Sequence, residues 1–402
     1  MTLSQPGLIW YIIGNKLESC NKQDRNLVAL YGEDLKGMET PQQALIPVIK
    51  TALPPLEEYI GYLQGIWERR QLTNNGPLVK ELEARLATYL GVKHCLLVSS
   101  GTIALQMAIK ALQLKGQIIT TPFSFVATSS AIVWEGCQPV YVDIDSRSFC
   151  INPAHIETAI SPETCAILAT HIYGHPCDVE QIQDIADKYQ LKIIYDAAHA
   201  FGVKYKEQSL LYYGDISTLS FHATKLFYTG EGGAVICNND DLAEKIRRMR
   251  DFGINGPEAF FDEVGINAKM SEFHAALGLC VLPTVSAVIK HRKSMCALYE
   301  RQLGGSSLTR PDLPAATDYN YAYYPVLFPS EASLKKTRKA LNDANVFPRR
   351  YFYPLLNKLA YVNPAAVPVA EDVASRVLCL PLYVELANDE VMRIADLIKQ
   401  SI

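Results

Sequence analysis

The fold of this chain is decided by the stretch KIIYDAAH, residues 192–199. Its apolar first half, 192–195, predicts a buried strand, and Asp196 stands where that strand ends. A carboxylate at the carboxyl end of a parallel strand faces the crevice in which α/β sheets bind ligands. The alternative is a structural Asp196 that caps the next turn. His199 follows closely enough to share a site with Asp196, so both are candidate site residues.

Similar apolar runs on either side of this stretch alternate with helical patterns. Alternation of this kind is typical of a mostly parallel α/β sheet, and continuous apolar strands indicate that helices cover both of its faces. The other predicted strands are residues 94–99, 117–121, 139–144, 166–171, 218–222 and 233–237. The helices predicted among them are 102–114, 126–135, 179–189 and 241–251.

The chain divides into three parts by its patterns. Residues 1–45 lack periodicity and are expected to form an irregular leader. We expect a large domain over residues 46–284, which holds the sheet, and a smaller C-terminal α/β domain over residues 285–402. The smaller domain contains a strand pattern at 321–328 and closes with a helical pattern at 388–400.

Composition excludes several classes of protein. The 402 residues carry 38 Lys+Arg against 42 Asp+Glu, a net charge of −4, so we expect no nucleic-acid partner. The apolar run Leu8–Ile13 is too short to span a membrane or to act as a secretion signal. Ten scattered cysteines without a C-x-x-C pair predict free, buried thiols. We therefore expect a soluble, cytoplasmic protein.

Two further features carry chemistry, and one pattern does not. Small residues at 99–102 lie between a predicted strand and a predicted helix, where free backbone N–H groups bind an anion or the first of them simply caps the helix. Lys225 follows an apolar strand and precedes a glycine-rich turn, so it is expected to enter a crowded site rather than solvent. His171 and His175 are spaced like metal ligands, but Gly174 and Pro176 interrupt any helix there, and no metal is expected.

An anion cradle, a strand-end carboxylate and a buried lysine together match pyridoxal 5'-phosphate (PLP). This cofactor needs a phosphate clamp, a carboxylate opposite its ring nitrogen and a lysine for its aldehyde. Asp196 and Lys225 fit the last two needs, and residues 99–102 fit the first.

From about Ile46 onward the chain resembles the nucleotide-sugar aminotransferases of the DegT/StrS family, which are fold-type I PLP enzymes. The resemblance lies in a set of motifs in order and at the right spacing. They are NGP at 75–77, SSGTIAL at 99–105, TPFSFVAT at 121–128, DAAHA at 196–200, SFHATK at 220–225, EGG at 231–233 and GINAKM at 265–270.

The resemblance implies a role for each matching residue. Lys225 is the Schiff-base lysine and proton shuttle, Asp196 pairs with the ring nitrogen, and His199 meets the ring hydroxyl. The residues implied to bind the cofactor otherwise are Gly101, Thr102 and Ser220 at its phosphate, Phe125 on its ring face, and Asn267. By resemblance, Asn267 reaches the phosphate held by a neighbouring subunit, so a homodimer with shared active sites is expected.

The substrate expectation rests on the segment Pro348–Pro354, which places Arg349 and Arg350 beside aromatic residues. Arginines suit a diphosphate geometrically, and Tyr351 and Tyr353 suit a sugar or base, although an exposed basic turn would look the same. By resemblance, the favoured reaction is transfer of an amino group from L-glutamate to C4 of dTDP-4-dehydro-6-deoxy-D-glucose.

Several alternatives to that reaction stay open. GDP- or UDP-linked sugars and amination at C3 fit the same motifs. A PLP-dependent dehydratase of this fold carries His at the position of Lys225, and a regulatory family member without turnover would not need an intact Lys225 and Asp196.

Overall fold

The computed structural model describes residues 45–256, 260–261 and 263–402, so the predicted leader lies outside the described residues except for Leu45. Residues Ile46–Ile402 form one compact unit.

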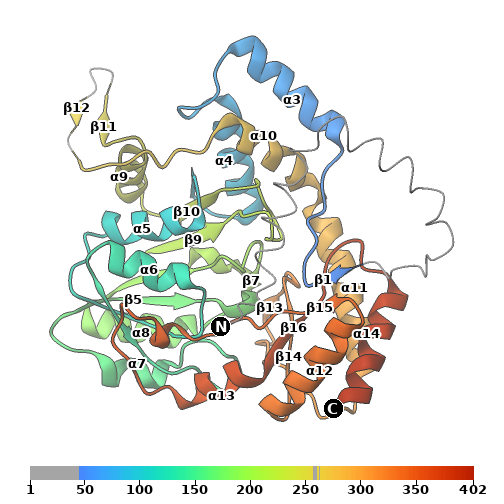
Figure 1. The fold of residues 1–402 in the computed structure, drawn as a ribbon. Coiled ribbons are helices and arrows are strands. Elements are labelled where there is room, and N and C mark those ends of the chain that lie inside the picture. The colour runs from blue at the N-terminus through green and yellow to red at the C-terminus, as the bar shows by residue number, and fades with distance from the viewer. Residues whose placement is uncertain (1–44, 257–259, 262) are drawn as a thin grey trace, which may run out of the picture. The chain divides into compact units, whose positions relative to one another are not determined.

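A seven-stranded sheet lies at the centre of this unit (Figure 1). Strand β10 runs antiparallel to both of its neighbours, β2 and β9, and every other neighbouring pair is parallel. The predicted mixed, mostly parallel sheet is therefore confirmed. In spatial order the strands are β2 (His94–Val98), β10 (Gly233–Cys237), β9 (Ile216–Ser220), β6 (Lys192–Asp196), β5 (Thr164–Thr170), β3 (Gln117–Thr120) and β4 (Gln138–Tyr141).

Helices cover both faces of the sheet because successive strand residues point in opposite directions. Leu96 and Val98 pack into one apolar cluster, while Cys95 and Leu97 pack into another. The first cluster includes residues of α5 (Gly101–Ala111), α6 (Val126–Trp134) and α9 (Asp240–Arg250). The second includes residues of α4 (Pro77–Leu90), α7 (Pro153–Ala159), α8 (Val179–Tyr189) and α10 (Glu272–Val281).

The C-terminal part has its own apolar cluster and contains a small antiparallel pair, β14 (Tyr324–Leu327) with β16 (Val377–Leu380). Strand β1 (Ile46–Pro47) pairs in parallel with β15 (Val346–Phe347), so the chain from residue 46 begins beside this part. The domain boundary near residue 285 stays a prediction. The helices here are α11 (Val285–Leu303), α12 (Glu331–Asp343), α13 (Pro368–Arg376) and α14 (Asn388–Ser401). Helix α3 (Leu56–Arg69) precedes α4.

The helical stretch from residue 272 to residue 303 is interrupted near its middle. A 3-10 turn at Leu282–Thr284 separates α10 from α11, and it contains Pro283, which has no N–H to donate within a helix. The combined stretch Glu272–Leu303 is long and apolar enough to cross a membrane by length and composition, but half of its apolar window is buried inside the protein.

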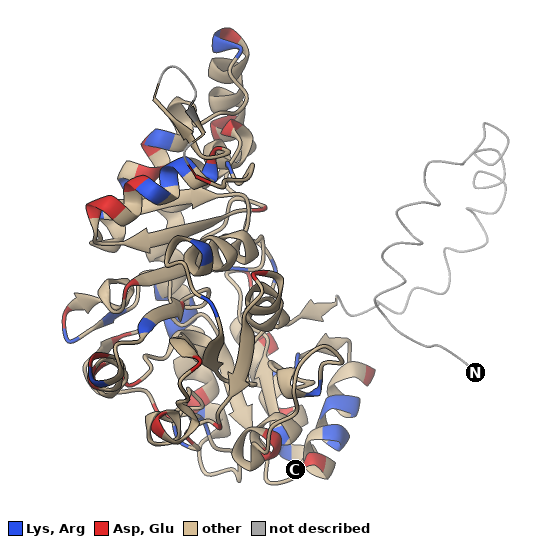
Figure 2. Cartoon of the chain, turned by 90° about the vertical axis from the view of Figure 1, so that its left-hand side faces the viewer, with Lys and Arg blue, Asp and Glu red and all other residues tan. Residues whose placement is uncertain are grey.

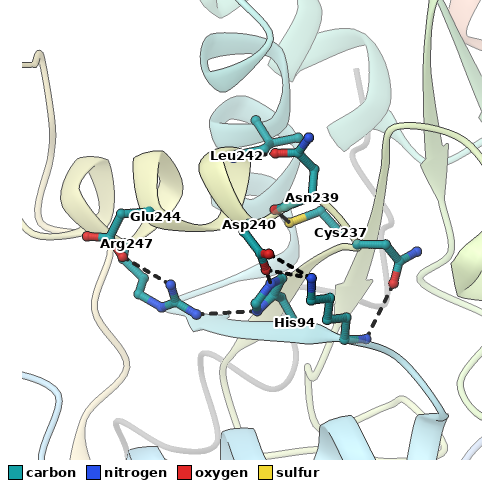
Figure 3. Close-up of polar contacts among 9 residues, drawn as sticks. His94, Cys237, Asn239, Asp240, Leu242, Glu244 and Arg247 are labelled. Carbon is teal, nitrogen blue, oxygen red and sulfur yellow. Dashed lines mark hydrogen bonds and ion pairs between the residues drawn. The ribbon is translucent and has the colours of Figure 1, made fainter.

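Charged residues of both signs are interspersed over the outer helices (Figure 2). Figure 3 shows one polar set, in which Asp240 at the start of α9 contacts the first residue of β2 and the residue before it. Its carboxylate accepts from Lys93 Nζ at 2.8 Å and lies 2.7 Å from His94 Nε2, and Arg247 lies 3.4 Å from the other ring nitrogen of His94. These contacts tie a strand to a helix and lie apart from the candidate site.

Candidate active site

The carboxyl ends of four parallel strands meet at one edge of the sheet. Gly101 follows β2, Thr170 ends β5, Asp196 ends β6 and Ser220 ends β9. Since these strands point the same way, their ends line a common space, a cavity of about 300 Å³. We call it the inner cavity. The predicted residues Thr102, Phe125, His199, Lys225, Arg349 and Tyr351 line it as well.

The start of α5 forms an anion cradle in this cavity. Ser100 caps the helix by accepting from the N–H of Ile103 at 3.2 Å. Among the described residues, no acceptor contacts the N–H groups of Gly101 and Thr102. Both residues line the cavity at the N-terminus of α5, where the helix dipole is positive. A Cβ added to Gly101 would lie 2.7 Å from that of Ser220, so glycine lets the two strand ends approach. These features fit the phosphate of PLP.

Asp196 is buried, with 6% of its surface exposed, and each of its oxygens has a donor. Oδ1 accepts from the N–H of Ala198 at 3.1 Å, and Oδ2 accepts from the hydroxyl of Thr128 at 3.1 Å. Burial raises the pKa of this carboxyl, while the Ala198 bond, the charge of Lys225 and the Thr128 bond oppose the rise. A carboxylate held in this way can stabilise a cation in the cavity, as a PLP ring nitrogen requires.

A chain of hydroxyl groups stands behind Asp196. Ser124 Oγ lies 2.9 Å from Thr128 Oγ1 and 3.1 Å from Thr170 Oγ1. Each hydroxyl has one proton, and that of Thr128 goes to Asp196, so Ser124 must donate to Thr128. Its own acceptor position is then filled by Thr170. The three hydroxyls are therefore all oriented toward the carboxylate.

His199 is held as a neutral ring by its surroundings. Its Nδ1 accepts from the N–H of Tyr173 at 3.2 Å, and its ring is stacked on Phe352 with centroids 5.7 Å apart. Burial, and then the charge of Lys225, hold its pKa well below the usual range. Nε2 must therefore carry the proton, and it can donate to a ligand in the cavity.

Lys225 lies in the turn after β9 and lines the inner cavity together with two smaller cavities. Burial lowers the pKa of its amine to about 8, against the opposing charge of Asp196. A lysine with a pKa this low has a substantial neutral fraction near physiological pH and is a competent nucleophile and base.

The remaining predicted residues are divided between two places. Phe125, at the start of α6, is 59% exposed and offers its ring at the cavity mouth. Asn267 is exposed, and it is not among the described residues that line this cavity or a second cavity beside it. It lies in an extended bridge with Asp251.

A second cavity of about 460 Å³ adjoins the first, and we call it the outer cavity. Ser124, Phe125, Arg349, Tyr351 and Phe352 line both cavities, whereas Arg338, Arg350 and Tyr353 line only the outer one. Arg350 donates to the carbonyls of Ala374 at 2.8 Å and Ser375 at 2.9 Å and lies over the ring of Tyr353. The two adjacent arginines therefore occupy different surroundings.

Several residues of the site had not been predicted from the sequence. Thr128 and Ser124 belong to the motif at 121–128 without a predicted role, and Thr170 closes β5 as Asp196 closes β6. Tyr323 lines the inner cavity with its ring 4.6 Å from that of His199. Polar residues at other strand ends could have indicated Thr170, whereas no local signal marks Tyr323.

The histidines and cysteines outside this site are structural in their contacts. His171 Nδ1 accepts from the N–H of Cys177 at 3.1 Å and its ring is stacked on Tyr195, while burial lowers its pKa to about 3. Within the described ranges, no group of three or more His, Cys, Asp or Glu could hold a metal ion. The nine described cysteines are free, and all but Cys165 are buried.

Comparison with known proteins places this site in a family. The family model of the DegT/DnrJ/EryC1/StrS aminotransferases matches residues 56–399. The dTDP-4-amino-4,6-dideoxy-D-glucose transaminase of Shigella dysenteriae is 45% identical over 372 residues, which cover 90% of this chain and 100% of that protein. An Escherichia coli protein of the same name is 41% identical, with 88% and 98% covered.

Solved structures agree in fold. A crystal structure of DesI in the presence of its TDP-sugar product has a TM-score of 0.84 at 32% identity, covering 89% of this chain and 92% of that one. Helicobacter pylori PseC, an aminotransferase of pseudaminic acid biosynthesis, has a TM-score of 0.83 at 26% identity, covering 89% and 99%. The fold and the family expected from the motifs are thus confirmed. The chain belongs to the DegT/DnrJ/EryC1/StrS family of PLP-dependent sugar aminotransferases.

Proposed function

We propose that this chain transfers an amino group from L-glutamate to C4 of dTDP-4-dehydro-6-deoxy-D-glucose, forming dTDP-4-amino-4,6-dideoxy-D-glucose. The observation that carries the proposal is the inner cavity, where Lys225, Asp196 and the start of α5 face one space. The 45% identity to the Shigella protein named for that sugar supports the choice of substrate.

PLP, when bound, supplies an aldehyde and an electron-withdrawing ring through which an amino group can pass from one carbonyl compound to another. The N–H groups of Gly101 and Thr102 and the hydroxyl of Ser220 would hold its phosphate. Asp196 would hold the protonated ring nitrogen, and Nε2 of His199 would donate to the ring hydroxyl. Phe125 would cover the ring face at the mouth of the cavity.

Lys225 would hold the cofactor at rest and move a proton at the amino-bearing carbon. An amine with its pKa at about 8 is partly neutral near neutral pH, and the neutral form is the one that accepts a proton. The negative charge of Asp196 keeps the pKa from falling further, so that Lys225 can also return the proton.

We infer a homodimer in which Asn267 serves the partner's site. Asn267 lies away from its own chain's cavities, on a segment that also exposes large apolar side chains to solvent. Those side chains are Phe252, Phe261, Val264 and Ile266. Exposed apolar residues of this kind are typical of a surface that another chain covers. The free thiols fit a cytoplasmic location.

The nucleotide sugar would reach from the inner into the outer cavity. Its sugar would lie near Lys225, and its diphosphate near Arg349 and Tyr351, which line both cavities. Arg350 and Tyr353 would form part of the outer wall, where the nucleoside lies.

The experiment is an assay of the purified holoenzyme with L-glutamate over a panel of keto-sugars, with the product identified by mass and by NMR of the aminated carbon. The panel contains dTDP-, GDP- and UDP-linked 4-keto sugars and a dTDP-linked 3-keto sugar. We expect the dTDP-4-keto sugar to be preferred, and a Lys225→Ala variant to show no turnover. Preference for another base, amination at C3, or loss of the sugar hydroxyl without amination would contradict the proposal.

A further inference from the structure

Arg349 occupies a special position, because it lies where the inner and outer cavities join. Its main chain is fixed by two hydrogen bonds with Cys379, at 3.2 and 2.8 Å. Its side chain is exposed, and the described residues give its guanidinium no hydrogen bond or ion pair. The main chain of Arg349 is thus held in place, while its guanidinium is available to a ligand.

Other positive groups in the inner cavity are already engaged. Arg349 is the only arginine among the described residues that line it, and Lys225 is the only lysine. His222 Nδ1 lies 2.8 Å from Thr224 Oγ1 in its own turn, and Nδ1 of His199 is taken by Tyr173. Among the described residues that line the inner cavity, Arg349 is therefore the arginine available to a substrate anion.

Transamination brings two different substrates to the same cofactor in turn. Both must bring their reacting carbon to the same place beside Lys225, because a single cofactor carries the amino group between them. The diphosphate of a nucleotide sugar lies beyond the sugar ring, toward the outer cavity. In L-glutamate the side-chain carboxylate extends away from the amino-bearing carbon, so it too would point toward the junction.

We propose that Arg349 binds the side-chain carboxylate of the amino donor in one half-reaction and the diphosphate of the nucleotide sugar in the other. This inference rests on the proposed function. A planar guanidinium suits both partners, since it can pair two N–H groups with two oxygens of a carboxylate or a phosphate. One residue would then select an acidic donor over a neutral one and prevent both substrates from binding at once.

The first test measures binding to the holoenzyme by calorimetry. Glutarate serves as the dicarboxylate probe and dTDP as the diphosphate probe. We expect the two probes to compete for one site. Arg349→Gln should weaken the affinity for each probe by about tenfold or more, as loss of a charged hydrogen bond would. Arg349→Lys, which keeps the charge, should recover part of both affinities. Arg85→Ala is the control, because Arg85 is half-exposed on α4 and pairs only with Glu81 in its described contacts.

Independent binding of the two probes would overturn the inference, and so would unchanged glutarate affinity in Arg349→Gln. A circular dichroism spectrum and a melting curve show whether each variant is folded, and Arg349→Lys supplies a second variant if Arg349→Gln is not.

The second test compares L-glutamate with L-glutamine as donors, by following the change of cofactor absorbance without any sugar. Arg349→Gln should lose most of the preference for glutamate, whereas a retained preference would overturn the inference. These outcomes are separable from those of the proposed function. If the protein aminates no nucleotide sugar but Arg349→Gln still lowers the affinity for glutarate, only the proposed reaction is contradicted.

Discussion

The backbone N–H of Tyr173 donates a hydrogen bond to Nδ1 of His199 at 3.2 Å, so a main-chain group chooses the tautomer of a cavity side chain. A backbone N–H can only donate a hydrogen bond, so Nδ1 must be the unprotonated ring nitrogen. The neutral ring therefore carries its proton on Nε2 and presents it to the cavity. The low pKa of His199 excludes the doubly protonated form at neutral pH. The result is a fixed donor rather than a titrating group.

Replacement of His199 should test this geometry. Glutamine can accept from Tyr173 and still donate into the cavity, whereas leucine can do neither. We expect His199→Leu to raise the dissociation constant of PLP about two- to tenfold, the value of one neutral hydrogen bond, and His199→Gln to stay close to wild type. Equilibrium dialysis against PLP measures both. Equal losses in the two variants would mean that His199 acts through its packing on Phe352.

The pKa of Lys225 predicts how the cofactor-free protein takes up PLP as pH changes. The neutral amine is the reactive form, so the rate of gain of visible absorbance should rise with pH, with a midpoint at about 8. The charge of Asp196 raises this pKa, and Asp196→Asn should therefore move the midpoint to lower pH. Asp240→Asn changes a carboxylate remote from the site and should leave it in place. A midpoint that rises in Asp196→Asn would contradict the assigned contact.

Shared sites predict complementation between two defective variants. Lys225→Ala lacks the amine of its own site, and Asn267→Ala lacks the contact it gives to the other site. A heterodimer of the two contains one site with neither lesion. After subunit exchange, the mixture should gain activity at limiting PLP, where Asn267→Ala alone is weak and Lys225→Ala alone is inactive. If Asn267 served its own chain, no intact site could form and mixing would give no gain over the Asn267→Ala parent.

The neighbouring arginines should differ when each is replaced by alanine. Arg350 donates to the carbonyls of Ala374 and Ser375 near the end of α13, and its loss should lower the free energy of unfolding by roughly 1.5–3 kcal/mol. Arg349→Ala should leave stability nearly unchanged and raise the KM of the nucleotide sugar more than Arg350→Ala does. Urea titration and steady-state kinetics separate the two effects. A loss of stability in Arg349→Ala together with a larger rise of KM in Arg350→Ala would mean that Arg350 binds the substrate and Arg349 supports the fold.

Local sequence patterns were sufficient to predict the sheet, its coverage by helices and several of the residues that gather at one edge of the sheet. Apolar runs such as 192–195 and the helical patterns between them are local, and a parallel strand must deliver the residue at its end to the common edge. Asp196 and the small residues at 99–102 could therefore be placed together without knowing any long-range contact, whereas the role of Ser220 came from the family resemblance. Lys225 was found for the same reason, since it follows a strand directly.

The support of these residues comes from contacts that form only when distant segments of the chain fold together. Thr170 and Ser124 are 46 positions apart in the sequence, and their hydroxyls meet only because β5 ends beside the start of α6. Arg349 and Arg350 look alike in the sequence, but Arg349 bridges to Cys379 in extended backbone, where successive side chains point to opposite sides. The guanidinium of Arg349 thus lies where the two cavities join, whereas that of Arg350 is hydrogen-bonded to α13. Contacts of this kind depend on where distant segments return, which a local pattern does not encode.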